Sequence, residues 1–166
     1  MKKLLFALLT VVLLTLTGCH GAREQLSFRI PENFATTRQY EITFRAKNDT
    51  NVTQAEIYKK AIANFQELYP NITVNMRLYT DYSRIYNDVI TNISTGTTPN
   101  LCITYPDHIA TNLTGENIVE PLDELLVDSR YGLGGSQVGF DAPKKEEIVP
   151  EFLAECSFSG HQYALP

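Results

Sequence analysis

Tyrosines and short polar side chains recur at three points of the sequence, each at or just after a predicted strand. Aromatic rings can stack on apolar C–H faces, while carboxylates and amides bond hydroxyl groups. This mixture of residue types favours the binding of a hydrophilic small molecule that also has C–H faces. The three sets are Arg45, Lys47, Asn48 and Asp49; Tyr79, Asp81 and Tyr82; and Tyr105 and Asp107.

Each of these residues also has a structural role open to it. Asn48 and Asp49 can form a turn, Asp81 and Asp107 can cap helices, and Tyr79 can pack in the core. The cluster as a whole is better evidence than any single member, and we predict ligand contacts from seven residues. These are Arg45, Lys47, Asn48, Asp49, Tyr82, Tyr105 and Asp107.

Residue spacings typical of catalytic and metal sites are missing from the sequence. The histidines form neither H-E-x-x-H nor a Cys/His zinc pattern, and no Gly-x-Ser-x-Gly elbow is present. The glycine-bearing loop at 131–142 matches neither a dinucleotide fingerprint nor a P-loop. We therefore predict a protein that is not an enzyme and that has no cofactor and no metal. The histidines, which we expect at the surface or in loops, are His20, His108 and His161.

Three strands are predicted to position the binding residues. Residues 40–46 (YEITFRA) and 72–78 (ITVNMRL) alternate between apolar and polar types and contain β-branched and aromatic residues, as strands do. Residues 101–105 (LCITY) form a short apolar run that suits a strand covered on both faces.

Two helices are predicted between these strands. Thr53 and Glu56 form a capping box, and Pro70 stops the helix that follows it. Asp81 can cap the second helix, which Gly96 ends. The apolar positions at helical spacing are Ile57, Ala61, Phe65 and Leu68 in the first helix, and Ile85, Val89, Ile90 and Ile93 in the second.

The alternation of strands and helices predicts an α/β fold with right-handed crossovers and a parallel sheet. In open sheets of this kind, ligands bind in the crevice outside the carboxyl ends of the strands. The three sets of binding residues are all expected at that edge.

The remainder of the chain has shorter elements. HIATNL and PLDELLVD resemble short helices, and residues 144–156 are predicted as a helix that Pro150 either kinks or begins. GHQYALP reads as a turn followed by strand residues, and we expect the sequence to be cut short there. The residues expected to point inward from the 144–156 helix are Ile148, Val149, Phe152 and Leu153.

The first residues have the features of an export signal. Two lysines precede an apolar stretch at 4–16, which is shorter than the roughly 20 residues of a membrane span and matches a signal-peptide core. Leu16, Thr17, Gly18 and Cys19 resemble the bacterial lipobox, in which the cysteine is lipidated and becomes the mature N-terminus. We predict a signal peptide at 1–18, a membrane-anchored Cys19 with a tether to residue 39, and a domain at 40–166.

The charge and the remaining cysteines add further limits. Without residues 1–18 the chain has twelve basic and nineteen acidic residues, a net charge of −7, so nucleic-acid binding is not expected. Cys102 and Cys156 are no disulfide framework; inert buried thiols are the favoured interpretation, and a disulfide stays open. Five sequons are taken as by-products of Asn and Thr richness: Asn48, Asn51, Asn71, Asn92 and Asn112.

Five stretches between residues 40 and 166 carry a resemblance to a known family, through their order and spacing. They are EITFRAKND, NFQELYPNITVNM, YNDVITNISTGTTPNLCITYPD, NIVEPLDELL and GHQYALP. Together they resemble the N-terminal part of an extracellular solute-binding protein of carbohydrate ABC transporters, family 1. This group includes maltose-, oligosaccharide- and glycerol-3-phosphate-binding proteins.

The resemblance implies a periplasmic-binding-protein type II-like fold, of which residues 40–166 form an incomplete first lobe. Its mainly parallel sheet is expected to be flanked by helices, and a ligand is clamped between two lobes. By this resemblance Tyr82 corresponds to a ligand-contacting tyrosine, and Asp107 lies near an acidic contact. The implied ligand is an oligosaccharide or a polyol-like solute, and the implied partner is a membrane permease.

Two other functions stay open at the level of sequence. One is a surface-anchored glycoside hydrolase, which needs an opposed pair of carboxylates. The neighbouring acidic residues at 123–124 and 146–147 do not supply such a pair, because adjacent helical residues point in different directions. The other is a lipoprotein that senses a solute or acts as an adhesin.

Overall fold

Strands and helices alternate through the first half of the chain. The computed structural model describes residues 29–34, 36–48, 52–114, 118–139 and 144–166. The strands are β1 (Tyr40–Lys47), β2 (Ile72–Tyr79), β3 (Leu101–Cys102), β4 (Ser157–Phe158) and β5 (His161–Gln162). The helices are α2 (Val52–Leu68), α3 (Tyr82–Thr95), α4 (Pro106–Asn112), α5 (Asp123–Val127), the 3₁₀ helix η1 (Lys145–Glu147) and α6 (Pro150–Glu155).

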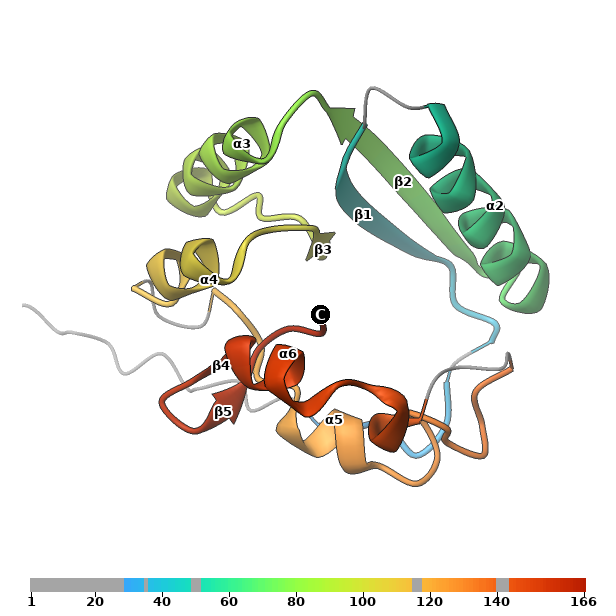
Figure 1. Cartoon of the computed structure of the whole chain (residues 1–166). Helices are drawn as coiled ribbons and strands as arrows, with labels where there is room; N and C mark the ends of the chain where they lie inside the picture. The colour runs from blue at the N-terminus through green and yellow to red at the C-terminus, as the bar shows by residue number, and fades with distance from the viewer. Residues whose placement is uncertain (1–28, 35, 49–51, 115–117, 140–143) are drawn as a thin grey trace, which may run out of the picture.

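The first three strands form one parallel sheet in the order β2-β1-β3. The register pairs Tyr40 with Ile72 at one end of β1 and Lys47 with Tyr79 at the other. The predicted α/β class and parallel sheet are confirmed, and the carboxyl ends of β1 and β2 lie at one common edge (Figure 1).

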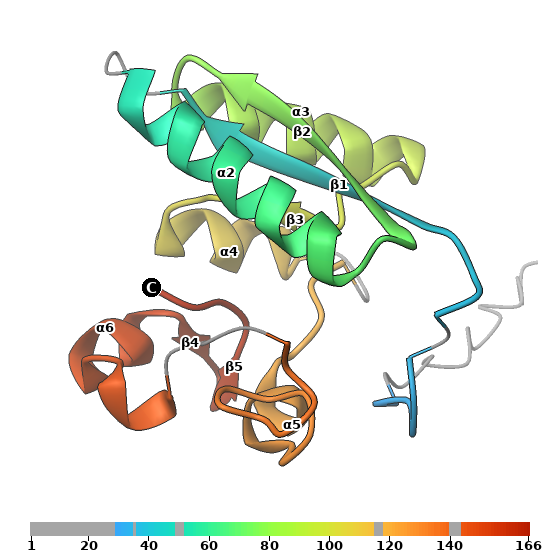
Figure 2. The same cartoon turned by 90° about the vertical axis from the view of Figure 1, so that its right-hand side faces the viewer.

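Helices α2 and α3 cover opposite faces of this sheet (Figures 1 and 2). Alternation along β1 explains the division, because successive side chains point to opposite faces. Phe44 packs its ring against Tyr58 of α2 with 5.8 Å between centroids. On the other face, Tyr79 of β2 forms a core with Ile85 and Val89 of α3.

Helix α3 has the ends that the sequence predicts. Asp81 is its N-cap and accepts a hydrogen bond from the backbone N–H of Arg84, at 2.9 Å from Oδ1. Gly96 ends it in the left-handed conformation, with φ of 70°. Of the predicted apolar row, Ile85 and Val89 are buried, whereas Ile90 is 37% exposed.

The predicted inner face of α2 is wrong. Ile57 and Leu68 are 59% and 47% exposed, whereas Ala55 is buried and Tyr58 faces the sheet. The sequence holds two apolar rows on this helix, offset by one residue or about 100° around its axis, and the row that includes Tyr58 fits against Phe44. The helix also begins at Val52, so Thr53 lies inside it and is not the cap.

Strand β3 is shorter than the predicted 101–105. It pairs with β1 alone among the described strands, and Leu101 is 56% exposed, so the expected cover on both faces is absent in the described part of the chain. One further bond, from Ile103 N to Arg45 O at 2.9 Å, extends the pairing. The chain then turns into α4 at Pro106, which cannot donate to a ladder.

The last third of the chain forms a separate group of short elements, α5, η1, α6 and the β4–β5 hairpin (Figures 1 and 2). Leu122 N donates to Gln162 O at 2.7 Å, which joins the start of α5 to the hairpin. Pro150 begins α6, so the alternative that it marks a helix start is confirmed. Val149 and Phe152 are 49% and 57% exposed, and their predicted inward orientation is wrong because α6 is only six residues long. Ile148 and Leu153 are half-buried.

The described part of the predicted tether has irregular structure and contacts the domain. Phe34 packs edge-on against Tyr131 with 4.5 Å between ring centroids. Cys102 and Cys156 are free thiols, which excludes the disulfide; Cys156 is buried as the favoured interpretation predicts, whereas Cys102 is half-buried. Cys19 lies outside the described residues, and among the residues described no helix has the length and apolar character needed to cross a bilayer.

Candidate functional site

Three of the predicted binding residues meet at the carboxyl edge of the sheet. Lys47 ends β1, Tyr82 begins α3, and Tyr105 is the residue before α4. The rings of Tyr82 and Tyr105 have centroids 4.4 Å apart and planes inclined at 47°. Lys47 Nζ lies 5.4 Å from the centroid of Tyr82, a cation–π distance. These three residues come from separate elements, and the parallel topology brings them together.

Two further rings extend this group. Tyr86 and His108 have ring centroids 4.4 Å apart, and His108 lies 5.5 Å from Tyr105 at a steep interplanar angle of 71°. We call Lys47, Tyr82, Tyr86, Tyr105 and His108 the edge cluster.

The sequence prediction did not include Tyr86 or His108 in the site. The signal was present in the spacing: Tyr86 follows Tyr82 at i+4 on α3, and His108 in the first turn of α4 follows the N-cap Tyr105 at i+3. Rings at helical spacing in two neighbouring segments indicate two ring pairs that meet, and the structure shows both pairs tilted, at 47° and 36°.

The exposed surface of the edge cluster is unevenly shared. Tyr105 is 50% exposed, whereas Tyr82 is half-buried because it packs against the core beneath α3 and has Lys47 and Tyr105 near its ring. Pro106 holds Tyr105 in an extended conformation, with φ of −83° and ψ of 152°. Tyr105 therefore offers more open ring surface than Tyr82, and it does so on a constrained backbone.

The remaining predicted contacts lie around the edge cluster with local bonds of their own. Asn48 is exposed, and its backbone N–H donates to Tyr79 O at 2.7 Å. Asp107 is exposed in the first turn of α4, and its Oδ1 accepts from His108 N at 3.0 Å. Asp107 is not the N-cap of α4, since Tyr105 occupies that position. Asp49 lies outside the described residues.

Arg45 lies beneath α3 and forms an ion pair there. Its side chain is 15% exposed, and its Nε lies 3.3 Å from Oδ2 of Asp88 on α3. Asp88 also accepts a hydrogen bond of 2.5 Å from the Tyr79 hydroxyl and lies 3.5 Å from Nη1 of Arg77. We call Arg45, Arg77, Tyr79 and Asp88 the Asp88 network.

The ionisation of this network follows from its contacts. Burial opposes the charge on Asp88, but the Tyr79 hydroxyl and the two guanidiniums outweigh it, and the pKa of Asp88 lies below its ordinary value. Burial, the hydrogen bond to Asp88 and the Asp88 charge together raise the pKa of Tyr79. Burial also raises the pKa of the Cys102 thiol, which fits an inert cysteine.

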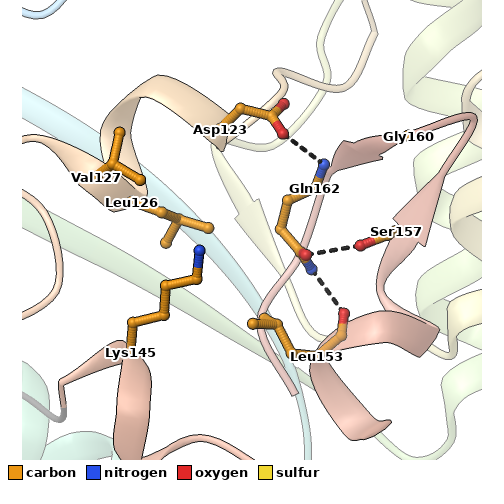
Figure 3. A pocket seen from close by; sticks show the side chains of 8 residues that line it. All are labelled: Asp123, Leu126, Val127, Lys145, Leu153, Ser157, Gly160 and Gln162. Atoms are coloured by element: carbon orange, nitrogen blue, oxygen red, sulfur yellow. Dashed lines mark hydrogen bonds between the residues drawn. The ribbon is translucent and has the colours of Figure 1, made fainter. Parts of the chain in front are cut away.

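A pocket of about 280 Å³ lies apart from the edge cluster, between α5, α6 and the β4–β5 hairpin (Figure 3). Its amide and carboxylate groups mostly bond to each other: Gln162 N donates to Asp123 Oδ1 at 3.2 Å, and Gln162 Nε2 donates to Leu153 O at 3.0 Å. None of the predicted binding residues lines it. The described residues contain no group of His, Cys, Asp and Glu side chains able to hold a metal ion. The pocket is lined by Asp123, Leu126, Val127, Lys145, Leu153, Ser157, Gly160 and Gln162.

The sequence matches no protein-family model and no curated protein. Solved structures do match. An extracellular solute-binding protein of family 1 from Alicyclobacillus acidocaldarius is 17% identical, with a TM-score of 0.58 over 78% of this chain and 28% of that one. The GacH receptor of Streptomyces glaucescens, described in unliganded form and with acarbose, is 15% identical, with a TM-score of 0.56 over 77% and 29%.

A third similar structure is an ABC transporter solute-binding protein from Thermotoga lettingae, described as bound with α-D-tagatose. It is 18% identical, with a TM-score of 0.56 over 77% of this chain and 29% of that one. This chain thus spans under a third of the length of these structures. The likeness shows a shared fold, and it confirms the predicted solute-binding-protein type of α/β architecture.

Proposed function

We propose that this chain is part of the first lobe of a solute-binding lipoprotein of an ABC importer, and that it captures an extracytoplasmic carbohydrate without converting it. The observation that carries this proposal is the packing of Tyr82 against Tyr105 at the carboxyl edge of the sheet. Ligands of open α/β sheets bind outside that edge. Two structures with this fold are described with a sugar or a sugar-like compound, α-D-tagatose and acarbose.

The proposed contacts divide the work between ring surfaces and polar groups. Tyr105 supplies the face on which a sugar ring stacks, because half of its surface is open. Tyr82 offers its hydroxyl group. Lys47, Asn48 and Asp107 surround the rings with groups that bond sugar hydroxyls, and Asp49 is proposed beside them. Arg45 is proposed to act on this site indirectly, through its ion pair with Asp88 on α3.

Capture requires a second surface that closes over the ligand. A ligand shifts the balance between an open and a closed form only through contacts that differ between the two forms. We propose that residues 40–166 belong to the first lobe and that a second lobe closes on it, as in hinge-type binding proteins. The closed form would then dock on a permease.

The anchor is proposed at Cys19. Residues 1–18 would be removed as a signal peptide, and residues 19–39 would link the lipid to the domain. Two acyl chains hold a protein stably on a membrane, since each buried methylene contributes about 0.8 kcal/mol. Mass spectrometry of the membrane fraction is expected to find diacylglycerol on Cys19, and Cys19→Ala is expected to abolish this modification. Recovery of unmodified Cys19 within an intact leader would contradict the anchor.

Sugar binding can be tested with the lipid-free protein by NMR on labelled tyrosine rings, which detects weak complexes. Titration with acarbose and with α-D-tagatose is expected to shift the Tyr82 and Tyr105 signals saturably and to return the sugar unchanged. Tyr105→Ala removes the stacking face. Phe152→Ala is the matched control, because Phe152 is an aromatic residue of similar exposure on α6. Absence of any shift with both compounds, or breakdown of the sugar, would contradict the proposal.

A further inference from the structure

We propose that Asp88 is a positioning residue: its network fixes the rotation of α3, and α3 in turn sets the ring pairs of the edge cluster. The importance of this for ligand capture rests on the proposed function. The positioning itself does not, because it concerns contacts within the chain.

Asp88 connects one helix to two strands. Its Oδ2 lies 3.3 Å from Nε of Arg45 on β1 and accepts a bond from the Tyr79 hydroxyl on β2. Its Oδ1 lies 3.5 Å from Nη1 of Arg77, whose guanidinium also lies 4.8 Å from the Tyr79 ring centroid. Both carboxylate oxygens are therefore engaged, and each bond restricts the helix in a different direction.

The face of the sheet beneath α3 requires a negatively charged side chain from the helix. The β1–β2 register places Arg45 beside Arg77, so two cations share this face. Arg45 is only 15% exposed at its side chain, and a charge so far removed from water is costly unless it is paired. Asp88 is the only acidic residue in α3, so no other residue of the helix can supply the negative charge.

The same helix holds the rings. Tyr82 and Tyr86 project from α3 onto Tyr105 and His108, with 4.4 Å between centroids in each pair. The apolar row of α3, which includes Ile85, packs on Tyr79, but apolar burial is non-directional and so does not by itself select one rotation of the helix. Hydrogen-bonded ion pairs are directional. The Asp88 network thus determines the rotation at which both ring pairs meet.

This inference gives Arg45 a different role from the predicted ligand contact. Arg45 acts through Asp88 on helix α3, and through α3 on Tyr82. It also lies beside Cys102 of β3, which pairs with Arg45 in the register. One guanidinium is therefore placed where the central strand, the edge strand and the helix meet.

The test compares ring contacts by NMR in the lipid-free protein and in Asp88→Asn, which keeps the side-chain volume but removes the charge. Nuclear Overhauser contacts between Tyr82 and Tyr105 and between Tyr86 and His108 are expected to weaken or vanish. The Phe44–Tyr58 contact on the opposite face of the sheet is expected to persist. Glu56→Gln on α2 is the matched control, since it removes an acid from the exposed pair with Lys59.

Asp88→Glu restores the charge and is expected to recover part of both ring contacts. A residue that acted only by filling space would not recover them. Persistence of both ring contacts in Asp88→Asn would overturn the proposal. In an Asp88→Asn variant that keeps the circular dichroism spectrum of the parent, simultaneous loss of the Phe44–Tyr58 contact would also overturn it, because the residue would then order both faces of the sheet. Tyr79→Phe, which removes one bond only, serves if Asp88→Asn does not fold, and the same outcomes apply to it.

Ligand affinity gives a second measurement that separates this inference from the proposed function. With acarbose as the probe, Asp88→Asn is expected to weaken binding roughly ten- to hundredfold. In a Tyr105→Ala background it is expected to have little further effect. If no variant or parent binds acarbose, the proposed function fails while the NMR result still decides the role of Asp88.

Discussion

Thr43 and Asn100 exchange three hydrogen bonds across 57 positions of the sequence. Asn100 Oδ1 accepts from Thr43 N at 2.9 Å and from Thr43 Oγ1 at 3.0 Å, and Asn100 N approaches Thr43 Oγ1 at 3.0 Å. Strand β3 begins at the next residue and has only two residues, so its backbone pairing with β1 is brief. The hydrogen bonds between Asn100 and Thr43 therefore add to the brief backbone pairing that holds β3 against β1.

Asn100→Ala is expected to lower the free energy of unfolding by about 1 kcal/mol, because it removes the acceptor of two hydrogen bonds at an exposed site. Asn100→Asp keeps an oxygen in this position and is expected to lose less. Urea unfolding followed by circular dichroism measures both. Equal stability of Asn100→Ala and the parent would show that the contact with Thr43 contributes nothing.

At position 96 there is room for a side chain, but the left-handed backbone conformation disfavours most residues other than glycine. A Cβ built there meets nothing within 4 Å, but φ is +70°. Gly96→Ala should therefore cost about 1 kcal/mol of stability from the left-handed backbone alone. Gly96→Asn should cost less, because Asn adopts this conformation more readily. Urea midpoints for the two variants test the order, and a reversed order would rule out the backbone explanation.

Elements with clear local signals were predicted correctly from the sequence. Asp81 and Gly96 mark the two ends of α3, because caps and left-handed glycines depend on residues close in the chain. The alternation likewise predicted the bounds of β1 and β2 to within one residue. These features need no knowledge of distant contacts.

The orientation of a side chain is hard to predict where it depends on a contact with a residue far away in the sequence. Ile57 and Tyr58 belong to two apolar rows of α2, and only the Phe44 ring on β1 selects the row that includes Tyr58. The ligand contacts stay a prediction, but the neighbours of the residues concerned show the same dependence on distant partners. Arg45 is a plausible ligand contact by residue type, and its ion pair with Asp88, 43 residues away, cannot be read from local pattern. Tyr86 and His108 became visible as site residues once α3 and α4 were known to be adjacent.

Acid is expected to destabilise the fold partly through Asp88. Its folded pKa lies below the ordinary value of 3.8, because the Tyr79 hydroxyl and the two guanidiniums outweigh the opposing effect of burial. The unfolded chain therefore takes up a proton at a higher pH than the folded chain, and stability falls as pH drops below the unfolded value toward the folded one. Urea unfolding between about pH 5 and pH 2 should show this loss.

Asp88→Asn cannot bind or release that proton and should flatten part of the acid slope. Three carboxylates outside this network, those of Asp81, Asp123 and Asp128, also have lowered pKa values, so some acid sensitivity should remain in the variant. An unchanged slope in Asp88→Asn would mean that its ionisation is not linked to folding.

Tyr82 and Tyr105 should respond differently to loss of the hydroxyl group if the proposed sugar site is correct. Tyr105→Phe keeps the stacking face and should retain most of the affinity for acarbose. Tyr82→Phe should weaken binding by about 1 kcal/mol, because its ring is flanked by Lys47 and Tyr105 and its hydroxyl is the group left to bond. NMR titration of the two variants measures the difference, and a larger loss in Tyr105→Phe would reverse the assigned roles.

We expect the segment before β1 to be held in place by contacts with Arg130 and Tyr131, which we call the seat. Arg130 Nη1 and the Tyr131 hydroxyl donate to Glu32 O at 3.1 and 3.3 Å, and Phe34 packs edge-on against Tyr131. Asp128 prepares this seat, because its Oδ1 accepts from the backbone N–H groups of Arg130 and Tyr131.

Phe34→Ala should release this segment and raise the rate of trypsin cleavage after the exposed Arg38 about fivefold, since an aromatic pair contributes about 1 kcal/mol. Tyr131→Phe keeps the ring contact and one of the two bonds to Glu32, so it should raise the rate less. Cleavage within α2 provides an internal control, because that helix lies away from the seat. A cleavage rate after Arg38 that is the same in Phe34→Ala and the parent would show that the seat does not hold the segment before β1 in solution.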